Sequence, residues 1–208
     1  YEETYSWLLL FEDGNRLDIG VETVEAMRKG SHRNKLFLPL LDKTDCLPKL
    51  PPPTDEDFHV KKPAERKFHG CCNEFFWSLC DVAKGIRRDE LPFAMTTYYT
   101  QAHHMLEVMM EWYIGSMTDY SVSCGKRNKY FKRYLPEEIY LQYLRTFPDS
   151  SYESFWKAIN ISCRLLHDTA VVVAESLSFT YPEDYEHGFL KYMEIVGAGE
   201  YFHAGYGI

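Results

Sequence analysis

The chain has 208 residues with a formal net charge of −8, and 45% of its residues are hydrophobic. It is therefore long enough to bury a substantial core, as one large domain or two small ones. The acidic balance excludes non-specific binding to nucleic acid or to an anionic membrane surface, because both require a basic footprint, and it favours a cationic small molecule as partner. The longest apolar run is far below the ~20 residues of a membrane span, so we expect no membrane partner.

The six cysteines predict free thiols rather than a disulfide framework. They show no repeated C-x-x-C spacing, and the adjacent residues Cys71 and Cys72 would form a poor disulfide on a helix. No segment resembles a secretory signal, so we expect reduced thiols and a cytoplasmic location.

The first predicted element is a β-hairpin over residues 5–24. The segment "LLLFEDGNRLDI" (residues 8–19) carries two apolar runs around an acidic turn with Gly14, which is typical of a tight hairpin. Asp18 lies in the returning strand between Leu17 and Ile19. Side chains alternate along a strand, so Asp18 faces away from these neighbours, toward either water or a cleft. The pattern leaves these two alternatives open.

A proline-rich stretch, residues 46–63, predicts an extended connector and a domain boundary. We place the domains at residues 1–60 and 61–208. The stretch from residue 21 to residue 41 mixes helix and strand signals. The acidic run at residues 55–57 follows the prolines, and we interpret it as a solvated loop.

The first long helix is predicted from Pro63 to about Arg88. At 100° per residue, one side of it gathers an apolar stripe that we expect to be buried: Phe68, Cys72, Phe75, Phe76, Leu79, Ala83 and Ile86. The other side gathers Glu74, Trp77, Asp81, Lys84 and Arg88. This second stripe is either a solvated charged face or the wall of a cleft, since a Trp flanked by acids suits a cationic or sugar ligand.

A second helix is predicted to begin at Asp89, as its cap, and to run past Trp112. Its methionines and aromatic residues are typical of a core stripe. His103 and His104 are adjacent, so they point about 100° apart on a helix and cannot chelate one metal together. Further helices are predicted over residues 137–146, 152–179 and 183–196.

The segment "GKRNKYFKR" (residues 125–133) is the strongest local charge signal in this acidic chain. It is either the solvated start of a helix or a basic loop that binds a polyphosphate, with Lys126 as a point charge. The Gly-Lys pair alone is a weak signal, because no Walker spacing precedes it.

Three segments in this order resemble the aminoglycoside 6-adenylyltransferases, the streptomycin-modifying family. They are "LLLFEDGNRLDI", "FHGCCNEFFWSLCDVAKGIRRDELPFA" (residues 68–94) and "CGKRNKYFKRYL" (residues 124–135). The resemblance extends from about Trp7 to Tyr192. It implies an α+β fold, in which residues 1–60 are the remnant of a polymerase-β-like nucleotidyltransferase sheet. Residues 61–208 would form a helical bundle that closes over drug and nucleotide.

The resemblance also implies the reaction, which is transfer of AMP from ATP to a streptomycin hydroxyl, with release of pyrophosphate and with Mg²⁺. Asp18 matches the third acidic position of the family motif, as a metal ligand or a general base. The preceding Asp-x-Asp pair has no counterpart at a matching place in this chain. From this and from the start at Tyr1 we expect a fragment of an enzyme whose other metal ligands precede Tyr1. The alternative is an inactive small-molecule-binding or interaction module that retains the bundle.

The remaining site residues are predicted by combining the resemblance with the chemistry of each side chain. Carboxylates bind guanidinium groups in bidentate fashion, so the acceptor set is Asn73, Glu74, Trp77 and Asp81, followed by Glu107 and Trp112. The nucleotide set is Lys126, followed by Lys84 and Lys129. Aromatic surface on the first two helices suits a dimer as well as a core, so the oligomeric state stays open.

Overall fold

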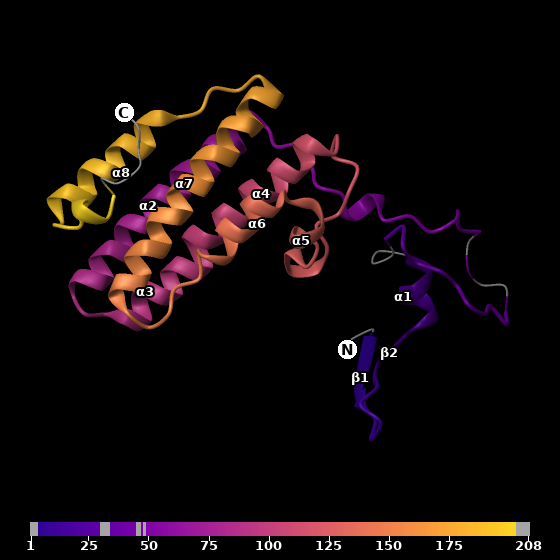
Figure 1. Cartoon of the computed structure of the whole chain (residues 1–208). Coiled ribbons are helices and arrows are strands. Elements are labelled where there is room, and N and C mark those ends of the chain that lie inside the picture. The colour runs from indigo at the N-terminus through magenta and orange to yellow at the C-terminus, as the bar shows by residue number, and fades with distance from the viewer. Residues whose placement is uncertain (1–3, 30–33, 45–46, 48, 203–208) are drawn as a thin grey trace. The chain divides into compact units, whose positions relative to one another are not determined.

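The computed structural model describes residues 4–29, 34–44, 47 and 49–202. The chain divides into two compact units, Tyr1–Asp57 and Phe58–Ile208, which are described separately. Figure 1 shows the elements of both units in chain order.

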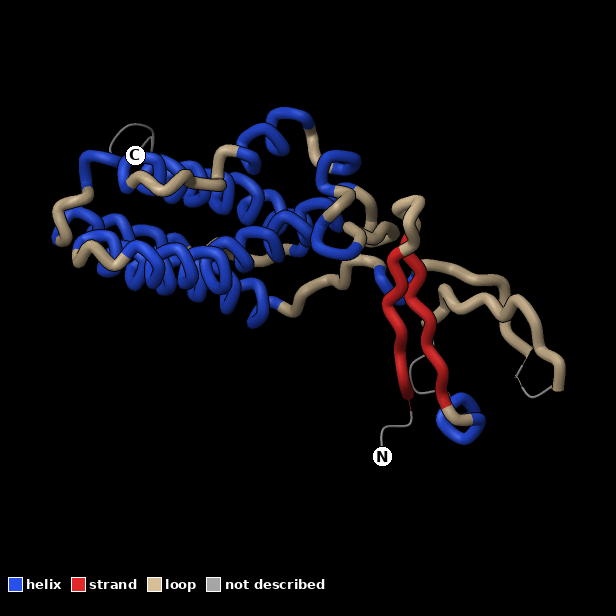
Figure 2. Tube along the Cα trace, turned by 90° about the horizontal axis from the view of Figure 1, so that it is seen from below, coloured by secondary structure: helices blue, strands red, loops and turns tan. Residues whose placement is uncertain are grey.

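A β-hairpin opens the N-terminal unit (Figure 2, red). Strand β1 (Thr4–Leu10) pairs antiparallel with β2 (Arg16–Glu22), with Leu8 opposite Asp18. The turn closes through hydrogen bonds from Phe11 N to Asn15 O and from Gly14 N to Phe11 O, and Gly14 has a φ of +83° that favours glycine. The predicted hairpin and its turn are confirmed.

Beyond the hairpin, the described part of the N-terminal unit holds one short helix, α1 (Val24–Lys29), within the stretch whose signals were mixed. The acidic run at residues 55–57 is exposed and overlaps a 3₁₀ turn (Glu56–Phe58). Two of its acids bind a single lysine: Lys35 Nζ lies 2.6 Å from Glu56 Oε2, and Lys35 N donates to Asp57 Oδ2 at 2.7 Å. This loop therefore folds back on itself.

The helical unit begins with α2 (Glu65–Arg87). Every member of its predicted apolar stripe is buried, and Phe68, Cys72, Phe75, Leu79 and Ala83 are fully enclosed. The first long helix and its core face are therefore confirmed.

The second predicted helix is present as α3 (Leu91–Thr97), a π-helical turn (Tyr98–Ala102) and α4 (His103–Met117). Its start differs from the prediction. Asp89 has a φ of +60° and lies outside the helix, which begins after Glu90. The Asp89 carboxylate accepts a hydrogen bond from the Tyr152 hydroxyl at 2.6 Å, so a contact with a distant segment replaces the cap.

The remaining helices are α5 (Phe131–Tyr134), α6 (Glu137–Leu144), α7 (Tyr152–Leu177) and α8 (Glu183–Ile195). The last three match the predicted ranges. Helix α2 packs on α3, α4 and α8, while α7 packs on α4 and α6 (Figure 1). Two strands followed by a helical bundle confirm the α+β class.

The core of the helical unit contains the predicted methionine and aromatic stripe, with Tyr98, Leu106, Met109 and Met110 fully buried. The Tyr98 hydroxyl donates to Thr146 O at 2.7 Å, so this polar atom is satisfied at the centre of the bundle. In the part of the chain that is described, no helix combines the length and the apolar character needed to cross a membrane.

Candidate substrate-binding site

Asp18 is held on the exposed hairpin of the N-terminal unit. Its side chain is 66% exposed, and the guanidinium of Arg16 lies 4.0 Å from its carboxylate. The strand fixes the carboxylate beside a tight turn and leaves it open to a ligand. Of the two alternatives left by the pattern, the N-terminal unit taken alone shows the solvent-facing one.

A complete Mg²⁺ site is not built by the described residues, among which no three His, Cys, Asp or Glu side chains gather to hold a metal. Mg²⁺ demands octahedral coordination by oxygen and is bound through one or two carboxylates together with waters and substrate phosphates. Asp18 fits such a site as one ligand, but it does not complete one.

The basic loop (residues 125–133) begins with a tight turn of the backbone at Gly125. Gly125 has a φ of +74°, and a Cβ there would lie 2.6 Å from the Tyr130 ring. The next two residues, Lys126 and Arg127, are exposed, and Lys129 Nζ lies 4.9 Å from the centre of the Tyr130 ring. Among the described residues Lys126 forms no ion pair, so its ammonium group is available to an anion.

Lys84 does not join this loop. It lies 19 residues after the start of α2, which at 1.5 Å per residue is ~28 Å along the helix axis. The basic loop belongs to the opposite end of α2, because Val60 N, just before α2, donates to Val122 O. Lys84 instead lies 2.5 Å from Asp81, and this hydrogen bond raises the pKa of Lys84.

The predicted acceptor residues on α2 face outward in part. Trp77 is 69% exposed, Glu74 accepts a hydrogen bond from the Ser78 hydroxyl at 3.3 Å, and Asp81 is the partner of Lys84. Glu74 and Asp81 thus make local contacts on the helix, while Trp77 presents an open indole surface.

Trp77 and Asn73 line a groove between α2 and α8, which we call the aromatic groove. Its volume is about 360 Å³, and it is lined by Asn73, Phe76, Trp77, Cys80, Asp184, Tyr185, Gly188, Phe189 and Tyr192. The Phe76 and Phe189 rings lie 5.5 Å apart. Burial raises the pKa of the Cys80 thiol to about 11. The sequence did not predict the residues that α8 contributes to this groove.

Glu107 and Trp112 lie elsewhere, on α4. Glu107 accepts a hydrogen bond from the Tyr143 hydroxyl at 2.8 Å, and His103 Nδ1 lies 3.8 Å from it. Burial lowers the pKa of His103, which favours a neutral imidazole there. Trp112 is half-buried against the core. The structure therefore does not bring these two residues into the aromatic groove.

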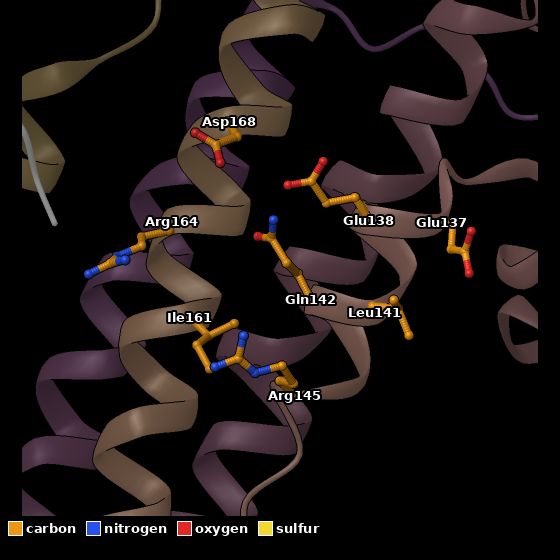
Figure 3. A pocket seen from close by; sticks show the side chains of 8 residues that line it. All are labelled: Glu137, Glu138, Leu141, Gln142, Arg145, Ile161, Arg164 and Asp168. Atoms are coloured by element: carbon orange, nitrogen blue, oxygen red, sulfur yellow. The ribbon is translucent and has the colours of Figure 1, made fainter.

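A second groove, which we call the charged groove, lies between α6 and α7 and has a volume of about 840 Å³. Figure 3 shows its lining residues, with Glu138 and Gln142 pointing from α6 toward α7 and Arg164 pointing away. Glu137, Leu141, Arg145, Ile161 and Asp168 complete the lining. Sequence reasoning missed this groove, although Ile161, Arg164 and Asp168 follow helical spacing.

Proteins to which this chain is similar are named for a single activity. Residues 1–196 match the family described as "Streptomycin adenylyltransferase". The "Aminoglycoside 6-adenylyltransferase" of Bacillus subtilis (strain 168) is 35% identical over 91% of this chain and 67% of its own length. The protein of the same name from Campylobacter jejuni is 34% identical over 87% of this chain and 63% of its own length.

Among solved structures, the crystal structure of an aminoglycoside 6-adenyltransferase from Bacillus subtilis superimposes with a TM-score of 0.63 and 30% identity. The match covers 93% of this chain and 71% of that one. This chain thus spans about two thirds of the length of its curated relatives. It belongs to the streptomycin adenylyltransferase family of nucleotidyltransferases.

Proposed function

We propose that this chain acts in the transfer of AMP from ATP to a hydroxyl of streptomycin or a related aminoglycoside, with release of pyrophosphate. The observation that carries the proposal is the family match over residues 1–196, together with relatives that are named for adenylyl transfer to aminoglycosides. The acidic chain supports it as well, because a net charge of −8 attracts a polycationic acceptor.

The acceptor is assigned to the outward face of α2. Streptomycin carries guanidinium groups, which the carboxylate of Glu74 can bind in bidentate fashion. Asp81 can do the same where the drug displaces Lys84 from it. The exposed indole of Trp77 offers the platform on which a guanidinium group or a sugar ring stacks. Asn73 adds an amide at the edge of the same face. Glu107 and Trp112, which lie on another part of the bundle, are left out of this set.

The triphosphate is assigned to the basic loop. Lys126 and Lys129 are exposed there and supply point charges for a polyphosphate. Lys84 takes a different role, since it neutralises Asp81 on the α2 face.

Asp18 is assigned to the reacting hydroxyl. A carboxylate on a stiff strand can take the proton of an attacking hydroxyl, and general-base help of this kind contributes ~10²- to 10⁴-fold. Mg²⁺ is expected to accompany ATP. The described residues offer the carboxylate of Asp18 to this ion but not a complete set of ligands.

The test is an assay of the protein with ATP, Mg²⁺ and streptomycin, in which any residues encoded before Tyr1 are included so that the expected metal ligands are present. Pyrophosphate release and a drug heavier by one adenylyl group are the expected products, and omission of streptomycin is the control. If no aminoglycoside is modified, the proposed reaction is wrong for this chain. Drug binding without turnover would instead favour the inactive binding module.

A further inference from the structure

We infer that the aromatic groove binds a cationic ring of the acceptor, so that α8 as well as α2 determines which drug is accepted. This inference rests on the proposed function and extends its acceptor site to residues that the sequence did not single out. The new residues are Asp184, Tyr185 and Tyr192.

The first support is the chemistry of the groove walls. Trp77 on α2 is 69% exposed and Tyr185 on α8 is 37% exposed, although both are large aromatic residues, and both line the same groove. Aromatic side chains from two helices line this groove, and aromatic rings attract a cation through the ring quadrupole and stack on planar guanidinium groups.

The second support is charge. Within the described part of the chain, Asp184 is the only charged residue that lines the groove, and it makes no ion pair there. Asp81, on the same face of α2, already has Lys84 as its partner. A single free carboxylate beside aromatic walls complements one cationic group and disfavours an anion such as the triphosphate.

The third support is that α8 is fixed near both of its ends, so the groove exists before a ligand arrives. Near the first turn, the buried carboxylate of Glu186 accepts hydrogen bonds at 2.8 Å from His167 Nδ1 and from the Tyr181 hydroxyl. Past the last turn, the guanidinium of Arg87 donates to Val196 O and Gly197 O. A preformed site loses less conformational freedom when it binds a ligand.

The size of the groove indicates how much of the acceptor it holds. Its volume of about 360 Å³ is at the small end of the roughly 300–1,000 Å³ that is typical of ligand sites. We therefore place one guanidinium-bearing ring in the groove. The rest of the molecule stays outside, where Glu74 and Asp81 can reach it.

The test uses streptomycin as the probe and measures its Kd by calorimetry. Asp184→Asn and Tyr185→Ala should each weaken binding about fivefold, as expected when one exposed ion pair or cation–π contact is lost. Glu194→Gln and Ile195→Ala are matched controls, because both residues are exposed on α8 outside the groove. The controls should change Kd less than about twofold. Unaltered thermal unfolding of the groove variants separates a binding role from a structural one.

A second measurement needs no variant. Cys80 lines the groove and is partly exposed, whereas Cys71, Cys72, Cys124 and Cys163 are buried. Saturating streptomycin should slow the alkylation of Cys80 at alkaline pH, which is measured from the masses of the peptides. Sucrose, a sugar without a positive charge, is the control and should not slow it.

The outcomes separate the two proposals. Unprotected Cys80, or an unchanged Kd in both groove variants, overturns the inference even if streptomycin is adenylylated. Protection of Cys80 without any turnover supports the groove and counts against the proposed reaction.

Discussion

The two grooves of the helical unit differ in how they could hold a cation. The aromatic groove is small, has a floor of core phenylalanines and presents one carboxylate. The charged groove is more than twice as large and lines its space with acids and arginines together. The difference shows that a concentration of charge and a site for a charged ligand are distinct properties.

The balance of charges explains why the smaller groove is the better candidate for a cation. Glu138, Arg145 and Asp168 are exposed, and an exposed ion pair contributes only about 0–1 kcal/mol, because water screens it. The ring of Trp77 is exposed as well, and a cation over an exposed ring gains about 0.5–1 kcal/mol. The aromatic groove offers such rings from two helices. Opposite charges also share the charged groove, so its net attraction for a polycation is smaller than the number of its acids implies.

The largest expected difference concerns stability. Phe189 is 3% exposed and lies under the aromatic groove, so Phe189→Ala should lower the free energy of unfolding by about 3–5 kcal/mol, the usual cost of removing a buried aromatic ring. Leu141 of the charged groove is 52% exposed, and Leu141→Ala should change it by about 0.5 kcal/mol or less. Urea unfolding of both variants measures the contrast. Equal losses of unfolding free energy in the two variants would contradict this difference in burial between Phe189 and Leu141.

The next largest effect is expected on the rate of the reaction, and it separates the chemical step from binding of the drug in either groove. Asp18→Asn should lower the rate of AMP transfer at least ~10²-fold if its carboxylate takes the proton of the hydroxyl. The Kd of streptomycin should stay within about twofold, because a general base stabilises the transition state of the reaction rather than the bound drug. A near-normal rate would return Asp18 to the role of a solvated strand residue.

A smaller effect is expected for the nucleotide. Lys126→Ala removes the exposed ammonium after Gly125 and should weaken ATP binding about tenfold, the loss of one charge-assisted contact. Lys84→Ala is the contrasting variant. Because Lys84 is paired with Asp81 far along α2, it should leave the Kd of ATP within about twofold. If Lys84→Ala weakens ATP binding as much as Lys126→Ala, the two lysines share a site.

The sequence predicted those elements that depend on neighbouring residues alone. The buried stripe of α2 and the hairpin turn at Gly14 follow from side-chain spacing and from a positive φ, and both agree with the structure. Asp89 was predicted as a helix cap from its position alone, but Tyr152, 63 residues later, binds its carboxylate. Such a partner cannot be predicted from local sequence.

For the same reason, the sequence predicted residues that α2 contributes to the candidate site but not those that α8 contributes. The helical wheel of α2 identified Trp77, but the pairing of α2 with α8 depends on packing between segments more than 100 residues apart. Lys84 and Lys126 were grouped by charge. Lys84 lies near the C-terminal end of α2, whereas the basic loop that contains Lys126 lies near its N-terminal end. The acids of the charged groove have the spacing of an ordinary solvated helix face, so nothing in the sequence indicates that they line a groove.

The smallest expected effect tests the charged groove itself. In the double variant with Glu138→Gln and Asp168→Asn, two exposed carboxylates are lost from the walls of α6 and α7. If the aromatic groove holds the cationic ring, the Kd of streptomycin should rise less than about threefold, through the weaker long-range field alone. That small change should vanish in 0.5 M salt, because screening removes interactions between exposed charges. A loss of tenfold or more that persists in salt would place the cation between α6 and α7, since only a direct, desolvated contact resists screening.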